Sequence, residues 1–231
     1  MTDYPIRKPA FDFDVASVRE RYLKLSTGQV YDVLAELGHP GRTMEPGIYP
    51  LTPSMKVAGP AFTVQATTTP SMAAVDTRLG MVKSMTEGCI QIRNSGGNAD
   101  VGHFGEINAT AAFVAGCRGA VLDGSTRDSN WLIEMGFPTF CRYRSPAQSF
   151  GRYMVTDYQV PIFVRGMDGH LLVEPGDFVV GDNDGVVIVP KALTLETLER
   201  AEKKAASEAL SRAEVAAGNS PLDVQEKYGK F

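Results

Sequence analysis

The stretch GAVLDGSTRD, Gly119 to Asp128, decides the fold and holds the most informative polar residues of the chain. Its first residues are small or apolar, which is typical of a buried strand, so we predict a strand over 120–122. A short polar loop over 124–127 then follows and ends in the adjacent pair Arg127 and Asp128. An Arg–Asp pair at a strand end is either a solvated surface ion pair or part of a functional site. The residues expected to lie near it distinguish these two interpretations.

The segments on both sides of this stretch alternate between strand and helix patterns. CIQIR (89–93) is a strand candidate, followed by the Gly-rich loop NSGGNADVGHFG and the helical segment EINATAAFVAG. Ile107, Ala111 and Val114 have helical spacing and predict the apolar face of that helix. A short helix, DSNWLIEMG, with Trp131 as a core residue, and the strand FPTFCR come after Asp128. This order predicts parallel βαβ units.

The outer parts of the chain follow other patterns. STGQVYDVLAELG predicts a capped helix, KVAGPAFTVQATTT a strand interrupted at Gly59–Pro60 by a bulge or edge, and residues 71–86 a helix. From Val160 the strands are too closely spaced for helices between them, which predicts antiparallel sheet with DNDG (182–185) as a hairpin turn. A charged helix with a thin, Ala-rich apolar stripe ends the chain at about 194–217, and we expect it to pack closely on something such as a neighbouring subunit.

Composition narrows the class of protein. The 231 residues carry a net charge of −4 without a basic cluster, so we expect no nucleic-acid partner. The N-terminus lacks the apolar region of a signal peptide, and no run approaches the roughly 18 apolar residues of a membrane span. Cys89, Cys117 and Cys141 are widely spaced in apolar segments, so we expect reduced core thiols and a cytoplasmic protein.

Topology places a second group of residues near Arg127 and Asp128. In right-handed βαβ units, the loops that leave successive strands emerge at the same edge of the sheet. The start of the helix, Gly105–Glu106–Ile107, should therefore lie close to the Arg–Asp pair. A helix N-terminus and an arginine bind anions, and a carboxylate such as Asp128 is a ligand of the kind Mg²⁺ uses. Glu106 is then an acid/base candidate.

Each of these residues also has a purely structural interpretation. A glutamate in a first helical turn is favoured by the helix dipole, and Asp128 is of a type that caps a following helix. The three histidines, His39, His103 and His170, share no metal-binding spacing, although His103 lies in the Gly-rich loop, where it is a candidate for ligand contact. The predicted convergence on one edge of the sheet favours an anion-plus-metal site.

With these residues in place, the segment GHFGEINATAAFVAGCRGAVLDGSTRD resembles the RraA-like family, which includes class II 4-hydroxy-4-methyl-2-oxoglutarate (HMG/CHA) aldolases. Glu106 and Arg127 bracket twenty residues and Asp128 follows, which is similar to the acidic-x20-Arg-Asp hallmark of these aldolases. VYDVLAELG, GPAFTV and VEPGDFVVGDNDGVVIVP also resemble family segments, so the likeness covers about residues 26–190. It implies a single domain over 1–231, an α/β/β/α sandwich (swivelling β/β/α) with a long C-terminal helix, and trimers or hexamers.

The resemblance also implies roles. Arg127 would bind the keto oxygen and stabilise the enolate, and Glu106 would orient the water that takes the hydroxyl proton, at a position where the aldolases commonly carry Asp. Asp128 would hold Mg²⁺ or Mn²⁺. The substrate carboxylate would be bound by the backbone at Gly105, Glu106, Ile107 and Asn108.

The implied outer surroundings of the metal include a glutamate from a neighbouring subunit's C-terminal helix. Glu208 is the best match, with Glu202 as its rival. The activity implied is metal-dependent cleavage of a 4-hydroxy-2-oxo acid to pyruvate, with oxaloacetate decarboxylation. The alternatives are a regulator that inhibits a ribonuclease, and a related lyase, hydratase or decarboxylase acting on another oxo or hydroxy acid.

Overall fold

The structure is a computed structural model that describes residues 5–70, 77–96 and 98–229. Its largest sheet has the strand order β1-β5-β4-β3-β2-β9-β10, and β6 also pairs with β2. The strands of this sheet are β1 (Tyr49–Pro50), β2 (Val57–Thr68), β3 (Ile90–Asn94), β4 (Ala120–Thr126), β5 (Thr139–Arg144), β6 (Tyr153–Tyr158), β9 (Phe178–Asp182) and β10 (Gly185–Val189). A separate ribbon pairs β7 (Ile162–Gly166) with β8 (Gly169–Val173).

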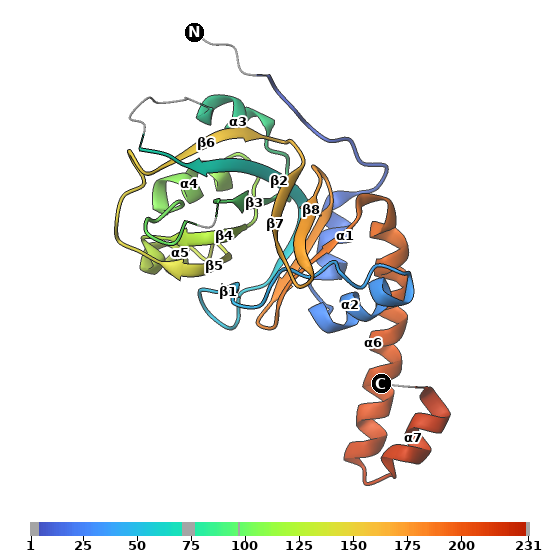
Figure 1. The fold of residues 1–231 in the computed structure, drawn as a ribbon. Coiled ribbons are helices and arrows are strands. Elements are labelled where there is room, and N and C mark those ends of the chain that lie inside the picture. The colour runs from blue at the N-terminus through green and yellow to red at the C-terminus, as the bar shows by residue number, and fades with distance from the viewer. Residues whose placement is uncertain (1–4, 71–76, 97, 230–231) are drawn as a thin grey trace.

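The predicted βαβ units form the middle of this sheet. β3, β4 and β5 are parallel neighbours, and α4 (Glu106–Val114) and α5 (Ser129–Glu134) connect them (Figure 1). β4 is longer than the sequence indicated, because residues 124–126 continue the strand instead of forming a loop. The register between β4 and β5 shifts between Leu122 and Ser125, which lets the strand extend after the Asp123–Gly124 step.

β2 joins the two halves of the sheet. The Gly59–Pro60 step does not interrupt the strand; it is where β2 changes partner, from antiparallel pairing with β9 over Val57–Pro60 to parallel pairing with β3 from Ala61. Gly59 is required there, because a Cβ atom would overlap the carbonyl oxygen of Gly88. The irregularity lies further along, between Gln65 and Ala66, in the pairing with β6.

The C-terminal strands are antiparallel, as predicted. β7 pairs with β8 and β9 with β10, and the second hairpin turns at DNDG. Asp182 at this turn also accepts hydrogen bonds from the backbone N–H and the hydroxyl of Thr27, 2.9 and 2.7 Å, at the start of α2 (Thr27–Glu36).

Three packed interfaces separate four layers and confirm the α/β/β/α sandwich (Figure 1). α4 and α5 pack on one face of β2–β5 through a cluster that includes Phe62, Leu122 and Phe137. The other face packs on β7–β10 through Ile92, Val121 and Phe140, among others. The far side of β9 and β10 is covered by α1 (Val15–Tyr22), α2 and α6 (Thr194–Ala216).

The helix predicted over EINATAAFVAG is confirmed as α4, but its apolar stripe faces solvent instead of the sheet. Ile107 and Val114 are each 82 % exposed and Ala111 is exposed, whereas Ala109 and Ala112 are buried against the sheet. Small side chains let the helix approach the sheet closely, and the larger apolar residues form an unpacked stripe on the outside. Trp131 of α5, expected in the core, is 57 % exposed.

The remaining helices include α3 (Arg78–Ser84), which overlaps the helix predicted over 71–86; residues 71–76 lie outside the described residues. α6 extends beyond the sheet layers, and α7 (Pro221–Tyr228) lies beside its end (Figure 1). The three cysteines are buried and free. Within the described residues, no helix combines the length and apolarity needed to cross a bilayer.

Candidate functional site

The Gly-rich loop is fastened to the end of β4 by backbone hydrogen bonds. His103 N–H donates to Ser125 O (3.0 Å), and Arg127 N–H donates to Phe104 O (2.9 Å), which also accepts from the Thr126 hydroxyl (2.9 Å). These bonds act as a short additional strand pairing. They place the start of α4 directly beside the residues that follow β4, which is the convergence that topology predicted.

Asp128 connects the two segments through its carboxylate. Its Oδ2 accepts from the backbone N–H of Glu106 (3.3 Å) and its Oδ1 from Arg127 Nε (3.2 Å). The residue has a φ of 57°, the left-handed region that aspartate tolerates better than most side chains. Although Asp128 occupies the position before α5, its side chain makes no capping bond there. The capping interpretation is therefore wrong, and the backbone conformation turns the carboxylate toward α4 instead.

Two glycines allow this close packing. A Cβ atom on Gly105 would overlap Asp128 Oδ2 and lie 3.0 Å from Arg127 Cγ. A Cβ on Gly102 would lie 2.6 and 2.7 Å from Arg127 Cβ and Cγ. Neither glycine has a positive φ in the left-handed range, so the requirement for glycine here is one of space rather than of backbone conformation.

The polar groups at this junction remain open to solvent on one side. The side chains of Arg127 and Asp128 are 39 % and 31 % exposed, and Glu106 is partly exposed. Ile107 and Asn108 lie in the first turn of α4, where backbone N–H groups have no acceptor within the helix. The described hydrogen bonds leave both Nη atoms of Arg127 unused. The junction therefore offers donors for an anion on two sides.

The oxygen ligands at this junction fit a divalent cation only if water and substrate supply most of its ligands. Within the described residues, no group of three or more His, Cys, Asp or Glu side chains is arranged to hold a metal ion. Asp128 alone offers a partly exposed carboxylate oxygen. Mg²⁺ is commonly held by one or two carboxylates, with waters and substrate oxygens completing its shell. The residues thus fit a cation of this kind, bound jointly with substrate.

Glu208 and Glu202 lie apart from this junction within the chain. Both are on α6, on the opposite side of the sheet layers from α4 and α5 (Figure 1). Glu208 accepts from Gln29 Nε2 (2.7 Å), and Glu202 forms a two-pronged ion pair with Arg21 (2.8 and 2.6 Å). One chain alone does not bring either glutamate to Asp128.

His103 supports the Gly-rich loop from inside. It is 3 % exposed, stacks on Tyr153 with ring centroids 4.1 Å apart, and its Nδ1 accepts from Ser125 N–H (3.4 Å). Burial, together with nearby Arg93, lowers the pKa of His103 to about 4, so the ring is neutral. It is a packing residue of the loop and not a side chain exposed to ligand.

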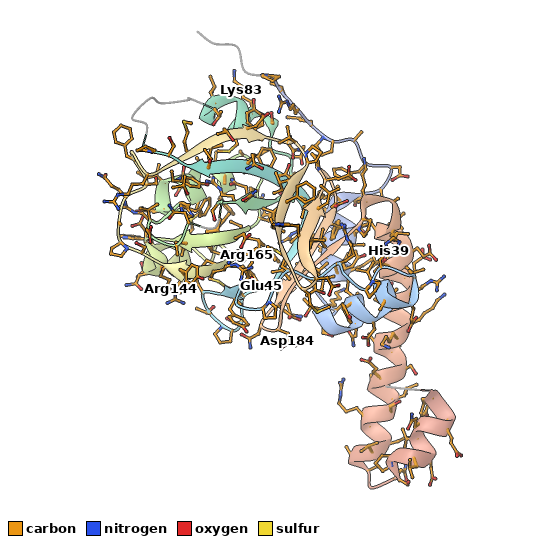
Figure 2. The ribbon with its side chains drawn as sticks, viewed as in Figure 1. His39, Glu45, Lys83, Arg144, Arg165 and Asp184 are labelled. Atoms are coloured by element: carbon orange, nitrogen blue, oxygen red, sulfur yellow. The ribbon has the colours of Figure 1, made fainter. Side chains whose placement is uncertain are left out.

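A buried charge network lies beneath the end of β4 and was not predicted. Asp123, 3 % exposed, accepts from Arg142 Nε (2.5 Å) and from the backbone N–H and Nε of Arg165 (3.0 and 3.3 Å). Glu45 forms an ion pair with Arg142 (3.1 Å) and lies 3.8 Å from Arg165. Glu45 and Arg165 are labelled in Figure 2. The network ties β4 to β5 and β7. Its members are far apart in sequence, and no local pattern connects Asp123 with Arg142, Arg165 or Glu45.

A cavity of about 390 Å³ opens beside the Arg–Asp pair. Its lining includes Thr126, Arg127, Asp128, Trp131, Arg144 and Ser145. Arg144 and Trp131 were not predicted as site residues. The only available signal was that Arg144 follows the FPTFCR strand, whose end should reach the same edge of the sheet as Arg127.

The fold and the junction at this edge define a class of α/β/β/α proteins with an Arg–Asp pair facing a helix N-terminus. Residues 27–188 match the model of the RraA-like family, described as Aldolase/RraA, and the chain belongs to that family. This confirms the resemblance drawn from the sequence.

Individual relatives agree with this assignment. A protein of Halalkalibacterium halodurans named "Putative 4-hydroxy-4-methyl-2-oxoglutarate aldolase" is 33 % identical over 164 residues, 70 % of this chain and 72 % of that protein. An uncharacterised protein of Pseudomonas syringae has a similar structure, with a TM-score of 0.80 at 27 % identity, covering 98 % of this chain and 99 % of the other. Streptomyces coelicolor RraAS2, described as an unusual member of the RNase ES inhibitor RraA family, has a TM-score of 0.75 at 27 % identity, covering 85 % and 97 %.

Proposed function

We propose that this protein is a divalent-metal-dependent class II pyruvate aldolase. It cleaves a 4-hydroxy-2-oxo acid, of the 4-hydroxy-4-methyl-2-oxoglutarate type, to pyruvate, and it decarboxylates oxaloacetate. The proposal depends most on the geometry of the junction. Asp128 accepts from the first N–H of α4 and also from Arg127, so a carboxylate, a guanidinium and a helix N-terminus lie next to one another. The H. halodurans relative, 33 % identical and named for this activity, supports the same class.

Different residues of the chain bind the carboxylate and the C2 oxygen of the substrate. The free N–H groups at Ile107 and Asn108 and the positive end of the α4 dipole receive the carboxylate of the 2-oxo acid. Arg127, whose Nη atoms remain available, donates to the C2 oxygen. When bound, a Mg²⁺ or Mn²⁺ ion held by Asp128 would supply Lewis-acid polarisation of the 2-oxo acid.

Proton transfer falls to Glu106. Its partly exposed side chain follows directly on Gly105 and makes none of the hydrogen bonds found among the described residues. It orients a water that takes the proton from the C4 hydroxyl, and the C3–C4 bond then breaks. Negative charge develops on the C2 oxygen, where Arg127 stabilises the pyruvate enolate. Oxaloacetate yields the same enolate on loss of CO₂, so one site serves both reactions.

The exposed stripe on α4 supports self-association next to this site. Ile107, Ala111 and Val114 present adjacent apolar side chains to solvent, and Phe113 is 49 % exposed. A second copy of the chain that covers this stripe would approach Glu106, which immediately precedes Ile107. We therefore keep the homotrimer or homohexamer, and Glu208 of a neighbouring copy near the metal, as part of the proposal.

The decisive experiment measures pyruvate release with a lactate dehydrogenase couple. The substrates are oxaloacetate and a panel of 4-hydroxy-2-oxo acids, assayed with Mg²⁺ and with EDTA. Turnover should require the metal and be lost in Arg127→Ala. Glu106→Gln should lose aldol cleavage but retain pyruvate binding. Turnover that survives both EDTA and Arg127→Ala would show that the reaction does not use this site.

The ribonuclease-inhibitor alternative makes the opposite prediction. Tight binding and inhibition of a ribonuclease, with no turnover of any oxo acid in Mg²⁺, would favour a regulator. The carboxylate at Glu106 has a role in the aldolase reaction and none in the regulator hypothesis, so it favours the enzyme.

A further inference from the structure

The cavity beside Arg127 extends away from the part of the site assigned to pyruvate. It borders Arg127 and Asp128, but its lining contains none of the residues from Gly105 to Asn108. It runs instead over α5 and the segment that follows β5. A substrate whose carboxylate lies at the start of α4 and whose keto oxygen lies on Arg127 can reach this space with its C4 substituent, because the cavity borders Arg127.

Arg144 supplies a second guanidinium to the cavity. It is the last residue of β5 and pairs with Thr126 across the strands, so it lies one strand away from Arg127. One nitrogen, Nη2, donates to Leu51 O (3.2 Å), which anchors the side chain. No carboxylate among the described residues forms an ion pair with it. An exposed, anchored arginine without an acidic partner is suited to bind a carboxylate from solution.

Trp131 forms an apolar wall of the same cavity. Its side chain is 57 % exposed although it belongs to the type of residue that normally buries its large ring. Pro146 adds a further apolar surface. The indole and the pyrrolidine ring therefore line the same cavity as Arg144 and add apolar surface that favours a flat, apolar group.

The volume of the cavity indicates how large that group is. About 390 Å³ lies at the lower end of the range found for small-molecule sites, well above what a methyl group fills. The space thus accommodates a substituent about the size of a substituted aromatic ring.

We propose that Trp131 and Arg144 form a subsite that selects 4-hydroxy-2-oxo acids whose C4 substituent has a flat apolar body ending in a carboxylate. This inference rests on the proposed function, because it assigns the substrate class of that same site. The reaction is balanced in the ordinary way. The C3–C4 bond breaks, the C4 hydroxyl loses its proton to give a carbonyl group (an aldehyde where C4 carries hydrogen, a ketone where it carries a second carbon substituent), and C3 gains a proton to give pyruvate.

The kinetic test uses two substrates that differ only in the terminal charge. They are the aldol adducts of pyruvate with 4-carboxybenzaldehyde and with benzaldehyde, and cleavage is followed as pyruvate release. Wild type should prefer the carboxylated adduct by about tenfold in kcat/KM, the size expected for one partly exposed charged hydrogen bond. Arg144→Gln should abolish the preference, and Arg144→Lys should keep part of it. Lys83→Gln, which removes a charge from α3 far from Arg144 (Figure 2), should leave it unchanged.

A binding test reads the subsite without turnover. Trp131 is the single tryptophan of the chain, so fluorescence excited selectively at tryptophan, and not at the tyrosines, reports on this cavity. 4-Carboxybenzaldehyde should quench it saturably, and benzaldehyde should require about tenfold more ligand for half-quenching. Arg144→Gln should make the two aldehydes equal. Trp131→Ala should raise KM for both adducts about fivefold, because it removes the aromatic wall that both share.

The outcomes separate this inference from the proposed function. Metal-dependent oxaloacetate decarboxylation without preference between the adducts, or a preference that persists in Arg144→Gln, overturns the subsite and leaves the aldolase intact. No pyruvate release from any substrate, in wild type with Mg²⁺, overturns both. Saturable quenching that Arg144→Gln leaves unchanged also overturns the role of Arg144.

Discussion

Replacing Gly105 by alanine tests whether the packing of α4 against Asp128 builds the site. The added Cβ would overlap Asp128 Oδ2 and lie 3.0 Å from Arg127 Cγ, closer than ordinary carbon contacts. Gly105 has a φ of −155°, which is extended backbone that alanine adopts freely, so the effect is purely steric. The carboxylate must retreat by roughly 1 Å, which breaks its 3.3 Å bond from Glu106 N–H.

A displacement of this size at a reacting centre costs about 100-fold in rate. We therefore expect kcat/KM for oxaloacetate to fall by about two orders of magnitude in Gly105→Ala. Stability should fall by only about 1–3 kcal/mol, the usual cost of an overpacked contact, so the variant remains folded. Activity is measured by pyruvate release, and stability by urea unfolding followed by circular dichroism.

Gly28→Ala provides the matched control. Gly28 lies in α2, and the nearest atom to an added Cβ is Ser26 Oγ at 3.8 Å, an ordinary contact. This variant should keep full activity and gain up to about 1 kcal/mol of stability, since alanine favours the helix. If Gly105→Ala retained more than half of the wild-type activity while folded, the contact between Gly105 and Asp128 would have no part in building the site.

Three further outcomes follow from the charges described above. Asp123→Ala should destabilise the protein by about 3 kcal/mol, because buried Arg142 would keep only the half-exposed Glu45 as an acidic partner. Asp157→Ala, at the partly exposed pair with Arg7, should cost under about 1 kcal/mol, and equal losses in urea unfolding would contradict the buried network. Because the folded pKa of His103, about 4, lies below its ordinary 6.5, the unfolded chain binds more protons between these values. The stability that His103 contributes is therefore complete above about pH 6.5 and lost toward pH 4, by up to about 3 kcal/mol, and unfolding curves of His103→Gln should lack this slope. Asp128→Asn keeps a side chain that tolerates a φ of 57° but removes the negative charge. Mg²⁺-dependent turnover should therefore fall at least about tenfold, while the melting temperature should stay within about 4 °C of wild type. A much larger fall in melting temperature would show that the charge of Asp128 stabilises the fold.

Local sequence patterns predicted most of the fold because the preference for helix or strand depends mainly on residues that are close together in the sequence. Alternating strand and helix segments indicated the parallel β3–α4–β4–α5–β5 order, and closely spaced short strands indicated the antiparallel C-terminal half. Parallel topology alone then placed the start of α4 beside Arg127, without any knowledge of distances. The pairing of the Gly-rich loop with residues 125–127 was not visible, because it depends on backbone groups and not on side-chain type.

The apolar periodicity of the sequence did not indicate which face of α4 is buried. The spacing of Ile107, Ala111 and Val114 correctly described a stripe on α4, but the sheet packs on Ala109 and Ala112 instead. A sequence pattern gives the direction of an apolar face and not the identity of its partner. The same limit applied to Trp131, and to Asp123, whose buried partners Arg142 and Arg165 come from other strands.

The order of the elements along the chain also governs when α2 can be buried during synthesis. Its main packing partners are β9, β10 and α6, none of which begins before Phe178. At a ribosomal rate of about 5–20 residues per second, the roughly 140 residues between α2 and these partners take about 7 to 28 seconds to synthesise. Throughout that interval the apolar side of α2, including Val30 and Leu34, lacks these partners on the nascent chain, so α2 acquires its full packing only after α6 has been synthesised.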